Sequence, residues 1–416
     1  MEHLLPPLAE GARTALGFFW KAGWAFVLGY FVSALIQAFV PKARLTRFMG
    51  DAGPRSVALS TLFGAASSSC SFAALSAARS LILKGAHFVA AVAFMFASTN
   101  LVIELGILIL IFLGWPFLAA ELVGGLCMIV LSALLIRWTY PRAWLDAARQ
   151  KVEEESPDVD EDFDWRERIR SREGWRMVAR RFTGEWGMVW EEILIGFTVA
   201  GFVAVLVPTS WWSAIFLLDV GPQIPEWLVV VENAVVAPFV AAATFIGSMG
   251  NIPLATVLSE NGVLFAGIMG FIYSDLMVPP LVAVNARYYG WRVALYIAAV
   301  MFVTIGVTAV TLHLAFGWAG LTPSGGRAVG EVVRFTLDYT FWLNLVMAGL
   351  ATWLIWLSLR RSPSAEDHVA GDEGGHDHGD PSPSKSPKRI AALCAVAVLV
   401  AGALAWLLLS TNQLSP

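Results

Sequence analysis

The chain has 416 residues, of which 57% are hydrophobic and 14% charged, with 18 tryptophans and a formal net charge of −4. This composition is too apolar for a soluble domain and predicts a membrane protein with several spans, and the small net charge gives no reason to expect a nucleic-acid partner. Its three cysteines, Cys70, Cys127 and Cys394, lie in apolar surroundings and form neither a disulfide framework nor a CxxC metal site.

Eight apolar stretches are long enough to cross a bilayer, and the first is expected to be retained because neither a basic leader nor a cleavage site accompanies it. They cover residues 16–40, 86–113, 117–138, 186–208, 263–286, 291–316, 336–359 and 390–409. Two further stretches, 56–83 and 236–260, each contain a small, polar segment near the middle. A helix over 72–83 would rise only about 18 Å against about 30 Å of hydrocarbon, which predicts a re-entrant hairpin with residues 67–71 at its tip.

The two halves of the chain share a pattern. After the polar segment comes a Gly-led helix, a Phe nine residues on, a polar break four residues later, and a Gly-Trp pair. The matching residues are Gly85, Phe94, Ser98 and Gly114-Trp115 in the first half, and Gly262, Phe271, Asp275 and Gly290-Trp291 in the second. Paired interruptions of this kind are typical of the binding site of a transporter built from inverted repeats.

Lys and Arg follow the first, third, fifth and seventh spans, so the positive-inside rule places these loops in the cytoplasm and both termini outside. The two halves then have opposite orientation. We therefore predict an all-α polytopic membrane protein with two inverted-topology repeats, each of three spans plus a re-entrant broken helical hairpin, and two extra C-terminal helices.

The expected organisation has six parts. They are membrane repeat 1 (1–140), a charged cytoplasmic linker (141–185), membrane repeat 2 (186–318), an additional membrane helix (319–361), a linker rich in His, Asp, Pro and Ser (362–389) and a C-terminal membrane helix (390–416). The composition of 362–389 predicts disorder. Its three histidines would make a poor metal site without a folded scaffold.

Candidate substrate-binding residues lie in the two polar segments and the first break. They are Ser67, Ser68, Ser69, Cys70, Ser71, Ser98, Thr99, Asn100, Gly250, Asn251 and Pro253. Cys70 is the candidate metal ligand, because thiolate binds soft metals and metalloids, although buried cysteine is often inert packing. Tight helix packing is the alternative interpretation of the serines.

Carboxyl groups inside spans are candidates for coupling transport to protons, since burying a charge in lipid is costly. Asp275 lies about mid-span, and Glu104 follows the break at Ser98. Structural hydrogen bonding is the alternative for both. Glu121, Glu191 and Glu192 lie nearer predicted span ends and are expected to snorkel toward the interface.

Four motifs together carry a resemblance to a known family. They are GAASSSCSF, LILKGAHFVAAVAFMFASTNLVIELG, GNIPLATVL and FIYSDLMVPPLVAVNARYYG. Over residues 56–316 the chain resembles the predicted-permease family that includes the arsenical efflux permeases. The resemblance implies a polytopic efflux permease, with trivalent organoarsenicals as the substrates of characterised members and thiol chemistry near the first motif. Here Cys70 stands alone, where many relatives have a Cys-Ser-Cys arrangement that would hold trivalent arsenic better.

The favoured function is a permease that exports a thiophilic metalloid or soft-metal species by alternating access, with a midplane site at the two hairpin tips. The alternative is a carrier or channel for a small anion, bound by the N-termini of half-helices. An enzyme using Cys70 or Ser69 as nucleophile is not expected, because no activating group is placed beside either in the sequence.

We expect no cofactor. The expected partners are a small-molecule or ion substrate and the lipid bilayer, without nucleic acid, and a homo-oligomer is compatible with the sequence. The expected location is the plasma membrane, which is the inner membrane in a bacterium. No Walker motif is present, so an ion gradient or the substrate gradient would supply the energy.

Overall fold

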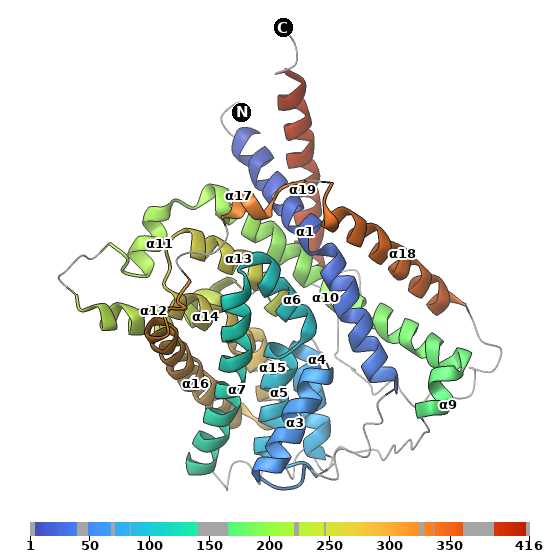
Figure 1. Cartoon of the computed structure of the whole chain (residues 1–416), viewed down its shortest axis with the longest axis vertical. Helices are drawn as coiled ribbons and strands as arrows, with labels where there is room; N and C mark the ends of the chain where they lie inside the picture. Colours follow the sequence, from blue (N-terminus) through green and yellow to red (C-terminus); the bar gives the residue numbers. More distant parts are fainter. Residues whose placement is uncertain are drawn as a thin grey trace.

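The computed structural model describes residues 5–39, 49–67, 71–83, 85–139, 165–219, 224–244, 247–323, 328–335, 337–360 and 387–412. Within these ranges the chain is helical and contains no strand (Figure 1). Eight of the described helices are long and apolar enough to cross a membrane, or nine if one bent pair counts as a span. The predicted all-α polytopic class is confirmed. Most of the two predicted linkers, at 141–164 and 362–386, lies outside the described residues.

The first half contains α1 (Leu5–Phe39), α3 (Pro54–Ser67), α4 (Ser71–Leu83), α5 (Phe88–Asn100), α6 (Ile103–Phe112) and α7 (Trp115–Thr139). With 14 and 13 residues, α3 and α4 each rise only about 20 Å, so neither crosses about 30 Å of hydrocarbon alone. The His87 N–H, after α4, donates to the Met49 carbonyl, before α3, at 2.8 Å. The start of α3 and the end of α4 therefore meet, which is the hairpin shape expected for residues 56–83.

The predicted span at 86–113 is bent. Its two pieces, α5 and α6, meet at 41° across Leu101 and Val102. The predicted polar break at Ser98 to Asn100 forms the last turn of α5, so the helix ends directly after it.

The second half contains α9 (Trp165–Arg170), α10 (Arg172–Leu206), α11 (Thr209–Ile215), α12 (Glu226–Thr244), α13 (Ser248–Glu260), α14 (Phe265–Tyr273), the 3-10 helix η2 (Ser274–Met277), α15 (Pro279–Tyr289) and α16 (Trp291–Trp318). After these come α17 (Val329–Val332), α18 (Tyr339–Leu359) and α19 (Pro387–Asn412). The stretch predicted at 236–260 begins earlier, because α12 starts at Glu226. The Leu264 N–H, after α13, donates to Asn233 Oδ1 at 3.2 Å, so α13 returns to the level of the second turn of α12.

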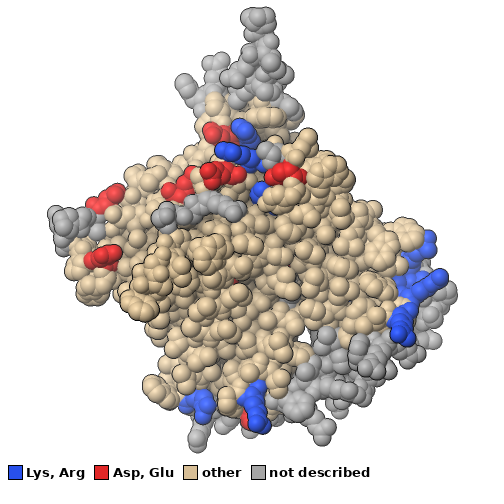
Figure 2. All heavy atoms as spheres, viewed as in Figure 1, with Lys and Arg blue, Asp and Glu red and all other residues tan. Residues whose placement is uncertain are grey.

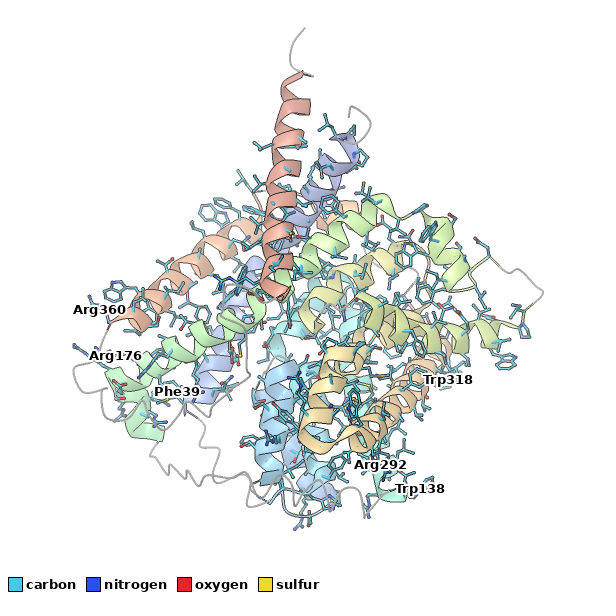
Figure 3. All side chains as sticks on the ribbon, turned by 180° about the vertical axis from the view of Figure 1, so that it is seen from behind. Phe39, Trp138, Arg176, Arg292, Trp318 and Arg360 are labelled. Atoms are coloured by element: carbon cyan, nitrogen blue, oxygen red, sulfur yellow. The ribbon has the colours of Figure 1, made fainter. Side chains whose placement is uncertain are left out.

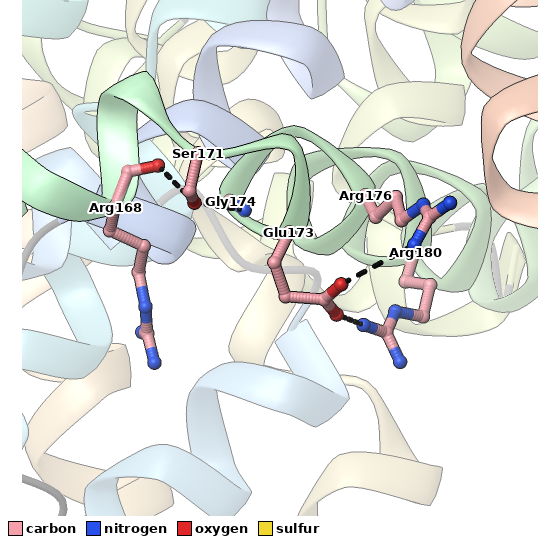
Figure 4. Close-up of polar contacts among 6 residues, drawn as sticks. All are labelled: Arg168, Ser171, Glu173, Gly174, Arg176 and Arg180. Atoms are coloured by element: carbon pink, nitrogen blue, oxygen red, sulfur yellow. Dashed lines mark hydrogen bonds and ion pairs between the residues drawn. The ribbon is translucent and has the colours of Figure 1, made fainter. Parts of the chain in front are cut away.

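The helix predicted at 186–208 is longer than expected. It begins at Arg172, where the Ser171 hydroxyl caps it by accepting from the Gly174 N–H at 2.9 Å (Figure 4). In its first turn Glu173 forms ion pairs with Arg180 at 2.6 Å and Arg176 at 3.6 Å. A capping hydroxyl and an acidic first turn favour a helix start at this point. The last residues of the predicted linker and the span that follows it are therefore one continuous helix.

The first helices of the two halves run antiparallel. Along the contact between α1 and α10, Phe18 lies 6.3 Å from Phe197 and Tyr30 lies 5.6 Å from Trp186, measured between ring centroids. A Cβ on Gly201 would come within 2.7 Å of the Ala15 Cα, so the missing side chain lets the backbones approach closely.

The last helices of the two halves also run antiparallel. Thr139 Oγ1, at the end of α7, lies 2.8 Å from the Tyr296 hydroxyl near the start of α16. Consistent with this, Trp138 and Arg292 lie at the same end of the molecule (Figure 3).

Charged side chains avoid the middle of the surface. Figure 2 shows a broad band with very few charged atoms on the face in view, with Asp and Glu mostly above it and at the left-hand margin, and Lys and Arg at the lower and right-hand margins as well as near the upper rim. An uncharged band is the surface that hydrocarbon can cover. The start of α1 and the end of α19 project from the upper end (Figure 1).

Candidate functional site

Asp275 joins the two hairpins. The Ser71 hydroxyl, on the first residue of α4, donates to the Asp275 carboxylate, and the N–H of Ser248, the first residue of α13, also interacts with it. Ser71 is 6% exposed and Asp275 1% exposed. Two helix N-termini thus converge on one buried carboxylate, and their positive partial charges stabilise negative charge there.

The break that presents Asp275 follows from the local sequence. Two prolines, Pro279 and Pro280, follow Val278, and a residue before proline is disfavoured in helix. Val278 is accordingly extended and interrupts the helix before α15. Asp275 falls in the short 3-10 helix between the end of α14 at Tyr273 and this interruption.

The other side of the first hairpin tip contacts α1 and α10. Ser33 and Gln37, both on α1, approach the Ser67 carbonyl at 3.4 and 3.2 Å. The same two side chains donate to Glu185 Oε1 on α10, the Ser33 contact being 2.8 Å long. Ser33, Gln37 and Glu185 thus form a polar junction that links the hairpin tip to two long helices.

Two further carboxyl groups lie beside these contacts. A Cβ on Gly29 of α1 would lie 3.0 Å from the Glu104 Cα, so the glycine makes room for the first turn of α6. Gly29, Ser33 and Gln37 are spaced four residues apart and share one face of α1. On the second hairpin, a Cβ on Gly247 would lie 2.5 Å from Glu192 Oε2.

Four carboxyl groups, on Glu104, Glu185, Glu192 and Asp275, therefore surround the hairpin tips. In the part of the chain that the structure describes, no group of three or more His, Cys, Asp or Glu is arranged to hold a metal ion.

The predicted site residues fall into three groups: those at or near the hairpin tips, those outside the described residues, and those that bond within their own helix. Ser67, Ser71 and Asp275 meet as described, and Gly250, Asn251 and Pro253 are buried in α13. Asn251 is fully buried, and neither of its amide atoms has a hydrogen-bond partner among the described residues. Ser68, Ser69 and Cys70 lie outside the described residues, so the role of Cys70 as a metal ligand stays a prediction.

The third group bonds within its own helix. Ser98 and Thr99 donate to the Met95 carbonyl at 3.1 Å each, and Asn100 donates to the Phe96 carbonyl at 3.1 Å. These bonds pair the three side chains with backbone carbonyls of α5, and their role in substrate binding stays a prediction. The three residues still lie next to the first hairpin, because a Cβ on Gly64 of α3 would approach the Ser98 nitrogen to 3.0 Å.

Sequence reasoning missed Ser33, Gln37 and Glu185. Each is an isolated polar residue when read along the chain, and Glu185 is the last residue of the predicted charged linker. The one available signal is the four-residue spacing of Gly29, Ser33 and Gln37 within an apolar helix.

The expectation that Glu121 snorkels is wrong. Glu121 is 0% exposed, and neither of its carboxyl oxygens has a hydrogen-bond partner within the described ranges. It lies on the buried face of α7 next to Ala120, whose carbonyl accepts the Tyr273 hydroxyl at 2.8 Å. A helix packed on this face prevents the side chain from reaching the interface.

Comparison with known proteins identifies relatives. A family model described as a predicted permease matches residues 8–314. The protein Rv2963 of Mycobacterium tuberculosis, whose name describes it as a permease, is 36% identical over 353 residues, which cover 82% of this chain and 86% of that protein. The protein YraQ of Escherichia coli is 32% identical over 118 residues, which cover 28% of this chain and 33% of that protein. No solved structure matches.

Proposed function

Because the chain belongs to the predicted permease family, we propose that it transports a small solute by alternating access between two inverted repeats, with the substrate bound where the two hairpin tips meet. The family and the apolar helices make it a multi-pass membrane protein. The location we propose is the plasma membrane, which is the inner membrane in a bacterium.

The order of elements supports inverted repeats. In the first half α1 is followed by the α3–α4 hairpin, the bent pair α5–α6 and α7, and in the second half α10 is followed by α12–α13, α14–α15 and α16. Gly85 and Gly262 have φ of +88° and +85° at corresponding turns, and Gly114 and Gly290 have φ of +98° and +85°. The antiparallel pairs α1 with α10 and α7 with α16 are the arrangement that repeats of opposite orientation require.

The observation that carries the site is the contact of Ser71 and Ser248 with Asp275, because it links both hairpin tips to one titratable group. A movement of either hairpin changes the surroundings of this carboxyl group. Binding of a solute at the tips is thereby linked to the charge of Asp275.

A thiophilic metalloid or soft-metal species is the substrate class we favour. Cys70 directly precedes Ser71 in the sequence, and thiolates bind such species. The four nearby carboxyl groups favour a neutral or cationic species over a free anion, since like charges repel. For the anion alternative, the converging N-termini of α4 and α13 are the supporting feature, and Asp275 would have to be protonated whenever the anion is bound.

Protons are the coupling ion we favour, with Asp275 and Glu104 as carriers. Both are almost fully buried, at 1% and 2% exposed. A buried carboxylate is costly unless it is compensated, so exchange of a proton for a cationic substrate keeps the charge of the site nearly constant.

Uptake into everted membrane vesicles tests the proposal. The solutes are trivalent methylarsenite, arsenite, zinc, copper(I) and phosphate, and the variants are Cys70→Ser and Asp275→Asn, with Cys127→Ser on α7 as the matched control. We expect uptake of a thiophilic species that both site variants lose and the control keeps. Uptake of phosphate alone, or full activity of Cys70→Ser, would contradict the favoured substrate class.

A further inference from the structure

At the junction between α1, α10 and the first hairpin, Ser33 and Gln37 have fewer donor hydrogens than hydrogen-bond contacts. The Ser33 hydroxyl carries one hydrogen and the Gln37 amide carries two. Ser33 lies within hydrogen-bond distance of Glu185 Oε1 at 2.8 Å and of the Ser67 carbonyl at 3.4 Å. Gln37 contacts the same two acceptors and also Ser33 Oγ at 3.0 Å. Three hydrogens cannot serve five contacts at full strength, so Glu185 and the Ser67 carbonyl compete for the same donors.

Glu185 is placed to bind a proton. It is 7% exposed, and its Oε2 has no hydrogen-bond partner in the part of the chain that is described. The charged groups that act on it there are Glu104 of α6 and Arg181, four residues earlier on α10, while α1 presents the uncharged Ser33 and Gln37. A proton added to Oε2 would therefore displace no existing contact.

We propose that Glu185 is a proton-binding site of the transporter and that its protonation moves Ser33 and Gln37 from Glu185 to the Ser67 carbonyl, which fixes the first hairpin tip to α1. This inference rests on the proposed transport function. When a proton binds Oε2, the negative charge is lost, and hydrogen bonds to a neutral acceptor are about half as strong as those to an ionised one. The Ser67 carbonyl then wins the competition for the donors.

The position of Glu185 indicates from which side of the membrane its proton comes. It lies toward the end of α10 that carries Arg172, Arg176 and Arg180, which the positive-inside rule assigns to the cytoplasmic side. Four residues beyond Ser67, Ser71 contacts Asp275. A proton taken up from the cytoplasmic side at Glu185 is therefore linked through the hairpin tip to the site at Asp275, and by reciprocity a solute at the tip changes the affinity of Glu185 for protons.

Hydrogen–deuterium exchange on the purified full chain tests the switch without any substrate. We expect the peptides that contain Ser67 to exchange at least about threefold more slowly at pH 6 than at pH 8, after correction for the chemical exchange rate, because the tip is held only when Glu185 is neutral. In Glu185→Gln the slow exchange persists at both pH values. The matched control is Glu173→Gln, a half-exposed carboxylate on the same helix, which should keep the native pH dependence.

Two outcomes overturn the inference: a native hairpin tip with no pH dependence, or a Glu185→Gln variant with the native dependence. If Glu185→Gln does not accumulate in membranes, Ser33→Ala replaces it. That variant leaves the carboxylate in place and removes one donor, so protection at pH 6 falls and exchange at pH 8 is unchanged. Unchanged protection at pH 6 in Ser33→Ala would equally overturn the inference.

A second measurement separates this inference from the proposed function. In vesicles loaded with trivalent methylarsenite, Glu185→Gln should still exchange internal for external solute at equal pH, while uptake driven by a pH gradient falls at least about tenfold. Equal loss of both processes would show that Glu185 only supports the fold, which contradicts the inference. If the native protein carries none of the tested solutes but its tip responds to pH through Glu185, the proposed substrate class fails and the proton switch stands.

Discussion

Adding one methyl group at Gly64 should move the first hairpin and weaken transport. Gly64 lies on α3, where it packs against the last turns of α5. A Cβ at this position would lie 2.7 Å from the Ala97 Cβ and 3.0 Å from the Ser98 nitrogen, and closer still to the Phe94 carbonyl oxygen. Non-bonded carbon atoms rest about 3.5–4.0 Å apart, so Gly64→Ala requires α3 to move away from α5 by about 1 Å.

The expected cost follows from this distance. Overpacking of this size destabilises by about 1–3 kcal/mol, and the better helix propensity of alanine returns about 0.5–1 kcal/mol. Ser67, at the hairpin tip, lies three residues from Gly64 on the same helix. Because a displacement of about 1 Å at a reacting centre can cost about 100-fold, transport should fall much more than stability does.

Thermal unfolding in detergent and vesicle uptake measure the two effects. The matched control is Gly306→Ala on α16, where no atom lies within 4 Å of the added Cβ. The control should be neutral or more stable by about 0.5–1 kcal/mol and fully active. The reasoning is refuted if Gly64→Ala matches the native protein in both assays, or if Gly306→Ala is equally damaging.

Three further changes test the fold. Asn233→Leu removes the acceptor of the part-buried Leu264 N–H and should destabilise by about 1–3 kcal/mol in thermal unfolding, because this donor loses its partner. A stability equal to native would contradict this. Gly85 has φ +88°, and no neighbouring atom lies within 4 Å of an added Cβ. Gly85→Ala should therefore lower the free energy of unfolding by about 1–2 kcal/mol through backbone strain alone, and Gly85→Asn should lower it less. A larger loss of stability in Gly85→Asn than in Gly85→Ala would exclude strain as the cause. Tyr296→Phe removes an exposed hydrogen bond to Thr139 and should change the free energy of unfolding by less than about 0.5 kcal/mol. A large loss of stability would contradict this and would mean that the contact holds α7 to α16.

Two features of the candidate site could be predicted from the sequence because their cues are local. Two prolines and an acidic residue inside an apolar stretch mark the break at Asp275, and the short helix after Ser71 marks a hairpin. Both features depend on a few consecutive residues. The partner of Asp275 could not be read in the same way, since Ser71 and Asp275 are 204 residues apart in the chain.

Glu121 and Glu185 show where local reading fails. Both are single acidic residues near the predicted end of a span, and hydropathy treats them alike. The Glu121 carboxyl group is buried and has no hydrogen-bond partner among the described residues, whereas Glu185 accepts hydrogen bonds from Ser33 and Gln37 of α1. Burial and pairing depend on which helix packs against a given face, and a sum of hydropathy along the chain contains no such term.

The sequence by itself determined that the chain is an all-helical membrane protein, where most of its spans lie and which family it belongs to, because apolar length and ordered motifs are properties of the chain alone. Only the tertiary structure decided that α10 runs unbroken from Arg172, that Ser71 and Ser248 meet at Asp275, and that Ser33 and Gln37 are shared between Glu185 and Ser67. These contacts join helices far apart in the chain, and the energy of a buried polar group depends on the partner that packing brings to it.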